Sequence, residues 1–180
     1  MTPNKINKLA TEINEYNIDA GWWSESQQNI YVKLSLVNSE IYEALEGHRK
    51  DLMDDKLPDR KMVEVELADY MIRLLDIRGW LGLKYIPMEK EVPLISSINP
   101  LPAQLLALNS CVIDLTRCLY IKASDDTLNN FYSICVESGE DIADLNKMDI
   151  WGAIKDKRKY NSIRADHKLE NRNKVGGKKY

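Results

Sequence analysis

Four acidic residues form two pairs with the same spacing: Glu40 with Glu43, and Glu66 with Asp69. Residues three apart on a helix lie on one face about a turn apart, so each pair could hold a ligand between two carboxylates. Four carboxylates brought together would repel one another unless a cation compensates their charge, and oxygen ligands suit Mg²⁺, with Mn²⁺ as a substitute. The spacing therefore predicts a divalent-metal site with these four acids as ligands, and clustered carboxylates can hold more than one ion. The alternative is that they are ordinary exposed residues on helix surfaces.

Both pairs lie in segments whose apolar residues recur with helical spacing. Such residues return every three or four positions from about 27 to 50 and from about 60 to 83, and the polar stretch 51–59 with Pro58 separates the two segments. Antiparallel packing of these two metal-binding helices, about 27–83 in all, would bring the acids of both pairs together.

The rest of the chain is also predicted to be helical. Further helices are expected at about 4–19, 103–121, 126–137 and 149–164, with a proline-containing loop at 85–101. No segment shows the apolar and polar alternation that is typical of a strand, and the chain holds only eight glycines. We therefore expect one all-α domain spanning residues 1–180, a helical bundle with a four-helix core and additional helices.

Composition restricts the cellular setting and the metal chemistry. No run approaches the roughly 18 apolar residues needed to cross a bilayer, and the first residues lack the apolar region of a signal peptide. We therefore expect a cytoplasmic protein with no membrane partner. The three cysteines have no CxxC spacing, and His48 and His167 are isolated, which leaves oxygen atoms as the main metal ligands.

The net charge of −3 conceals a basic C-terminal segment, residues 153–180. This segment holds ten Lys and Arg residues against three acids, so the first 152 residues carry a net charge of −10. Such a segment could be a solvated tail, an arm that binds nucleic acid, or a set of cations that hold phosphates beside an acidic metal site. The charge balance alone leaves these interpretations open.

The order of the two acidic motifs resembles the signature of the MazG-like all-α NTP pyrophosphatases of bacteria and phages, a superfamily that includes MazG, the dimeric dUTPases and the dCTP pyrophosphatases. The segments that carry the resemblance are Gly21-Trp22-Trp23, Asn38 to Glu46 with Arg49, Glu66 to Asp76, Lys157-x-x-Tyr160-Asn161-x-x-Arg164-Ala165-Asp166-His167-Lys168, and Gly176-Gly177-Lys178-Lys179. The resemblance covers residues 4–84 well and 149–180 moderately, whereas residues 85–148 match only as helices.

This resemblance implies an enzyme, a nucleoside triphosphate pyrophosphohydrolase. In the superfamily, Mg²⁺ ions bridge the carboxylates and a triphosphate, and water attacks the α-phosphorus to give a nucleoside monophosphate and pyrophosphate. The substrate would be a (deoxy)nucleoside triphosphate, and Glu40 or Glu43 would be the catalytic residue that orients or deprotonates the water. The resemblance also implies a homodimer or homotetramer in the cytoplasm, which would be the host cytoplasm for a phage-encoded protein.

Substrate contacts are expected from both ends of the chain and from the second acidic helix. The candidates to hold phosphate oxygens are cationic or polar residues of the C-terminal segment: Lys157, Asn161, Arg164, Lys178 and Lys179. Arg73 is a further candidate substrate contact. A disordered basic tail is the alternative interpretation of this segment.

The nucleoside would lie further along the same helices. Trp22 and Trp23 are candidates to stack on the base, although a Trp between helices is more often a core residue. Asp76 lies seven residues after Asp69, hence about 10 Å further along one face, where it could accept hydrogen bonds from the exocyclic amine and ring N–H of guanine. This favours a purine dNTP such as dGTP. An ion pair of Asp76 with Arg73 or Arg78 is the alternative.

A second class of function competes with the enzyme. The chain could be a non-catalytic helical interaction module whose basic tail binds nucleic acid, although we consider nucleic acid the less favoured partner. A di-iron carboxylate bundle is disfavoured because neither histidine follows a glutamate by three residues.

Overall fold

Six α-helices form the described part of the chain, which in the computed structural model comprises residues 1–24, 28–87, 95, 97–164 and 171. They are α1 (Pro3–Asp19), α2 (Ile30–Lys50), α3 (Met62–Leu81), α4 (Leu101–Tyr120), α5 (Asp125–Leu145) and α6 (Ile150–Ile163). Within these residues no β-strand forms, and an isolated bridge joins Met53 to Lys61. None of the described helices is long and apolar enough to cross a membrane. The prediction of an all-α bundle is confirmed.

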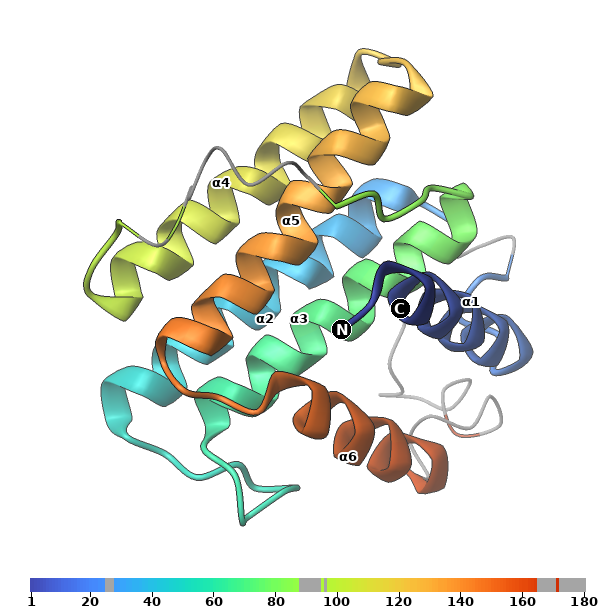
Figure 1. Ribbon diagram of the computed structural model, residues 1–180. Helices are drawn as coiled ribbons and strands as arrows, with labels where there is room; N and C mark the ends of the chain where they lie inside the picture. The colour runs from blue at the N-terminus through green and yellow to red at the C-terminus, as the bar shows by residue number, and fades with distance from the viewer. Residues whose placement is uncertain (25–27, 88–94, 96, 165–170, 172–180) are drawn as a thin grey trace.

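Four helices pack in a closed ring around the core. α2 contacts α3, α3 contacts α5, α5 contacts α4, and α4 contacts α2, while α1 and α6 flank α3 (Figure 1). Because α3 is covered by α1, α2, α5 and α6, it is apolar on nearly all sides, as a surrounded helix must be. Its buried apolar residues are Val63, Val65, Leu67, Ala68, Tyr70, Met71, Leu74, Leu75 and Ile77. The acids that α3 also buries must therefore meet polar groups of its neighbours.

The helix ends place both acidic pairs well inside their helices. The Asn29 side chain accepts hydrogen bonds from two backbone N–H groups in the first turn of α2, and Asp149 does the same for one N–H of α6. At the other ends, Asp51 (φ 51°) closes α2 and Gly82 (φ 67°) closes α3, both in the left-handed conformation that ends helices.

α5 is eight residues longer at its C-terminal end than the apolar spacing predicted, because it runs to Leu145 and not to Glu137. Ser138 and Gly139 are weak helix formers, yet the helix continues through them. Gly139 lies where α5 meets α3, and a Cβ there would come within 2.8 Å of the Met71 sulfur. Close packing of the two helices therefore overrides local propensity. The other helices begin and end within three residues of the predicted positions.

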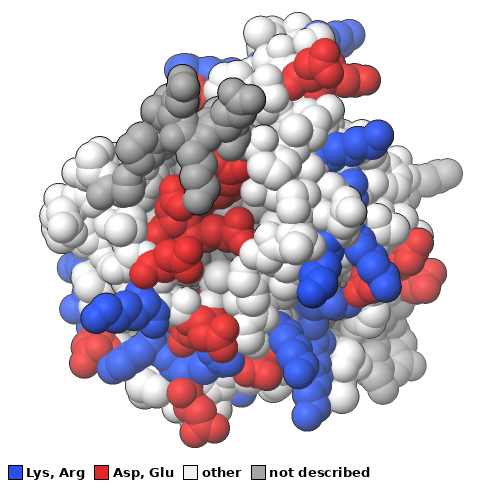
Figure 2. Space-filling view, viewed as in Figure 1, with Lys and Arg blue, Asp and Glu red and all other residues white. Residues whose placement is uncertain are grey.

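Charged side chains are unevenly distributed over the surface. Figure 2, viewed as in Figure 1, shows acidic side chains gathered near the middle of this face and basic side chains mainly below and to the right of them. Burial, together with the nearby charges of Glu137, Glu140 and Asp141 on α5, raises the pKa of Tyr85. The cavity described below is lined by residues of other elements.

Candidate functional site

A cavity of about 580 Å³ brings most of the predicted site residues together. Its walls come mainly from α2, α3 and α6, and its volume lies within the range of small-molecule sites. The acids that line it are Glu40, Glu43, Glu66, Asp69 and Asp76, and the cations are Lys33, Lys56, Arg73, Lys157 and Arg164. The cavity therefore combines an acidic centre with surrounding positive charge.

Three of the four predicted metal ligands converge within this cavity. Carboxylate oxygens of Glu40, Glu43 and Glu66 all lie within 4.8 Å of one another. Glu40 and Glu66 are 3% and 7% exposed, whereas Glu43 is exposed at the cavity rim. The three-residue spacing within α2 and the packing of α2 on α3 thus produce the acidic cluster, by which we mean Glu40, Glu43 and Glu66.

The fourth predicted ligand, Asp69, is held by a cation from another helix. Its Oδ2 lies 2.7 Å from the Nζ of Lys157 on α6, and both side chains are largely buried. Arg73 pairs in the same way with Glu40 through its Nε. Lys157 and Arg73 therefore balance part of the negative charge at the centre of the cavity.

Burial also changes the protonation of three acids that line the cavity. Burial and the neighbouring Asp69 charge together raise the pKa of Glu66 to about 9, although the Lys157 charge opposes the shift. Burial likewise raises the pKa values of Asp69 and Glu43. The acids thus do not all ionise together at neutral pH without added positive charge. The three crowded carboxylates are a set of oxygen donors that could hold a hard divalent cation such as Mg²⁺.

Asp76 is a buried hydrogen-bond acceptor at the far end of the cavity. Its Oδ1 accepts hydrogen bonds from Trp23 Nε1 at 2.9 Å and from Asn14 Nδ2 at 2.8 Å. Burial raises its pKa, and these hydrogen bonds oppose the shift. The alternative ion pair does not form, because Arg73 contacts Glu40 and Arg78 donates to a backbone carbonyl of α1.

The two tryptophans have different environments. Trp22 lines the cavity. Trp23 is 4% exposed and stacks on Trp80, with ring centroids 4.5 Å apart and an angle of 10° between the planes. Trp23 is therefore a core residue that holds Asp76, and of the two only Trp22 lines the cavity.

Two cations of the cavity were not predicted from the sequence. Lys33 donates from Nζ to the Trp22 carbonyl at 2.7 Å, and its Nζ lies 5.0 Å from the centre of the Trp23 ring. It precedes Glu40 by seven residues, so the helical spacing that grouped the acids could have found it. Lys56 lies in the connection between α2 and α3, where no periodic signal exists, and its N–H donates to the buried Asp54.

The C-terminal candidates are only partly described. Asn161 and Arg164 line the cavity together with Lys157, and the Arg164 guanidinium lies 5.4 Å from the centre of the Tyr160 ring. Lys178 and Lys179 lie outside the described residues.

Comparison with known proteins adds no family to this description. No family model, no curated protein and no solved structure matches the chain. The MazG-like resemblance therefore stays a prediction that rests on the motifs, and the function has to be argued from the cavity.

Asp76→Ala should lower the free energy of unfolding by about 2 kcal/mol, because it leaves the buried N–H donors of Trp23 and Asn14 without their acceptor, and an unsatisfied buried donor costs roughly 1–3 kcal/mol. Urea unfolding of the metal-free protein measures the effect. Asp59→Ala, at an exposed position, is the matched control and should change stability little. Equal stability of the two variants would show that the bonds from Trp23 and Asn14 do not hold this end of the cavity together.

Proposed function

We propose that the protein is a Mg²⁺-dependent pyrophosphohydrolase that cleaves a (deoxy)nucleoside triphosphate at the α-phosphorus, releasing the monophosphate and pyrophosphate. The observation that carries the proposal is the acidic cluster, with its oxygens within 4.8 Å, in a cavity that also has five cationic side chains on its walls. A magnesium triphosphate complex presents the complementary charges, since its metal attracts carboxylates and its phosphates attract Lys and Arg. The MazG-like motifs independently support the same activity.

The roles of the residues follow from their positions. Glu40, Glu43 and Glu66 would hold Mg²⁺, with Asp69 as the fourth candidate ligand. When bound, Mg²⁺ supplies positive charge that neutralises the phosphate oxygens. The cations Lys56, Lys157 and Arg164 would bind and orient the phosphates. Catalysis of this kind depends more on positioning and charge than on covalent chemistry.

Glu43 is the better of the two candidate bases. Its carboxylate is accessible at the rim of the cavity, whereas Glu40 is buried and hydrogen-bonded by Arg73. We propose that Glu43 orients the attacking water and accepts its proton.

The nucleoside would occupy the end of the cavity that Trp22 and Asp76 line. Asp76 is two helical turns, about 10 Å, beyond Asp69, a separation suited to a nucleoside next to its phosphates. Hydrogen bonds from Asn14, Trp23 and Asn17 already use part of the acceptor capacity of Asp76. The preference for a purine dNTP, above all dGTP, therefore stays a prediction. It rests on the hydrogen-bond acceptor capacity that Asp76 has left and on the wide ring surface of Trp22.

Turnover of a panel of dNTPs with Mg²⁺, with EDTA and with Mg²⁺ restored tests the proposal. We expect pyrophosphate release with Mg²⁺, loss of release with EDTA, recovery on adding Mg²⁺ or Mn²⁺, and the highest kcat/KM for dGTP. Hydrolysis that persists in EDTA would contradict the metal role. A preference for a pyrimidine would contradict the predicted base without affecting the reaction type.

A further inference from the structure

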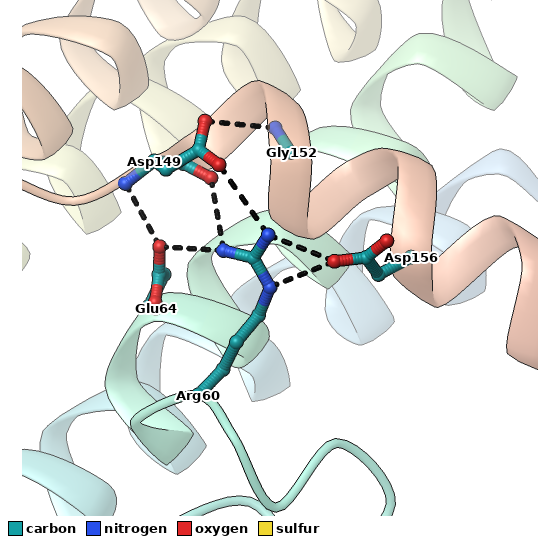
Figure 3. A network of polar contacts seen from close by, with 5 residues as sticks. All are labelled: Arg60, Glu64, Asp149, Gly152 and Asp156. Atoms are coloured by element: carbon teal, nitrogen blue, oxygen red, sulfur yellow. Dashed lines mark hydrogen bonds and ion pairs between the residues drawn. The ribbon is translucent and has the colours of Figure 1, made fainter.

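Arg60 joins three acids from two helices in one network. Its guanidinium lies 2.9 Å from Glu64 through Nη1, 3.3 Å from Asp149 through Nη2, and 3.0 and 2.8 Å from Asp156 through Nε and Nη2 (Figure 3). The backbone N–H of Asp149 also donates to Glu64 at 2.8 Å. The network therefore ties the connection before α3 and the first turn of α3 to the start of α6.

These contacts hold α6 at its N-terminal cap and at its second turn. Asp149 is the N-cap of α6 and accepts a hydrogen bond from its first turn, while Asp156 lies in its second turn. The Arg60 side chain is 18% exposed, so its charge-assisted bonds are only partly screened by water. A guanidinium presents five donors in a rigid fork, and a Lys ammonium at this position could not make the same set of contacts.

The residue after Asp156 is Lys157, which reaches into the cavity. Successive residues on a helix point about 100° apart, so the face that turns Asp156 toward Arg60 turns Lys157 toward α3. There its Nζ lies 2.7 Å from Asp69, and its side chain is 4% exposed. A shift of α6 would carry Lys157 away from Asp69 on α3. Because the Lys157 side chain is tightly packed, it has little freedom to compensate, so loosening α6 should separate the two groups.

We propose that Arg60 is a positioning residue that acts on the site through Lys157, by holding α6 at the angle at which Lys157 meets Asp69. The part of the inference that concerns substrate rests on the proposed function. The link from Arg60 to Lys157 does not, and can be measured in the metal-free protein.

The Lys157 ammonium can be observed directly by ¹⁵N NMR of the metal-free full chain. A buried, ion-paired ammonium exchanges its protons slowly, and loss of one signal in Lys157→Met assigns it. We expect Arg60→Gln to abolish or shift this signal. Arg158→Gln is the matched control, since it removes an ion pair between the next residue of α6 and Glu12 of α1, and it should leave the signal unchanged.

Kinetics then separate positioning from a general loss of structure. Arg60→Gln should raise KM for the magnesium dNTP complex about tenfold with a smaller change in kcat, the size expected for one charge-assisted contact. In the Lys157→Met background the same substitution should add nothing. Additive effects of the two substitutions would overturn the proposal, because they would show that Arg60 acts by another route.

The outcomes distinguish this inference from the proposed function. If Arg60→Gln fails to fold, Asp156→Ala removes the acceptor of two Arg60 hydrogen bonds, and the Lys157 signal of that variant decides the question. An unchanged Lys157 signal in the variant that folds overturns the positioning role. A lost signal in a protein that hydrolyses no dNTP supports the positioning role and refutes the proposed function.

Discussion

Glu40→Gln should lower dNTP turnover about a thousandfold, since losing about 4 kcal/mol of charge stabilisation slows a reaction by this factor. Glu40 is buried, its carboxylate oxygens lie close to those of Glu43 and Glu66, and Gln preserves its shape while removing its charge. Steady-state pyrophosphate release with saturating Mg²⁺ measures the effect.

The matched control is Glu46→Gln on the same helix. Glu46 is exposed and pairs with Lys50 on the surface, so this variant should turn over substrate like wild type. Melting curves add a test of metal binding, because a ligand that binds only the folded state raises Tm. Wild type and Glu46→Gln should both gain stability with Mg²⁺, and Glu40→Gln should gain less. If Glu40→Gln keeps full turnover and the full Mg²⁺ effect, Glu40 has a structural role and the proposed site is wrong.

The metal-free protein should lose stability as the pH rises from about 5 to 9. In the unfolded chain Glu66 titrates near its ordinary pKa of about 4.3, whereas burial raises its pKa in the folded protein to about 9. Between these values the folded state holds a proton that the unfolded state has released, so the free energy of unfolding falls as pH increases. The raised pKa values of Asp69 and Glu43 act with the same sign.

Glu66→Gln identifies the source of this dependence. Gln resembles the protonated acid, so the variant should match wild type at about pH 5 and exceed its metal-free stability at about pH 8. Saturating Mg²⁺ should stabilise wild type more at the higher pH, because the metal competes with the proton for the same carboxylates. Urea unfolding across this pH range provides the curves. Parallel curves for the two metal-free proteins would show that Glu66 is already ionised and that the crowding argument fails.

The acidic cluster could be predicted because its geometry is mostly local. Glu40 and Glu43 share one face of α2 through their spacing alone, and antiparallel packing of two consecutive helices is the simplest way to bring Glu66 toward them. The all-α bundle could be predicted for the same reason, since each helix has its own apolar periodicity.

The contacts between distant segments could not be predicted. Lys157 was identified as a phosphate contact, but its pairing with Asp69 depends on where α6 lies against α3. Asp76 and Trp23 were both assigned to the base, yet they bond to each other because Asn14 and α1 close over them. That approach requires Gly79, where a Cβ would come within 2.4 Å of the Asn14 Cβ. Nothing in local spacing indicates such an approach.

Hydrolysis of a dNTP in ¹⁸O-labelled water, with Mg²⁺ and with EDTA, tests the central claim most directly. Attack of water on the α-phosphorus places the label in the nucleoside monophosphate and leaves pyrophosphate unlabelled, and mass spectrometry of the two products distinguishes them. We predict labelled monophosphate with Mg²⁺ and no product with EDTA. Label in pyrophosphate, release of orthophosphate in place of pyrophosphate, or the absence of hydrolysis with Mg²⁺ would contradict the proposed activity.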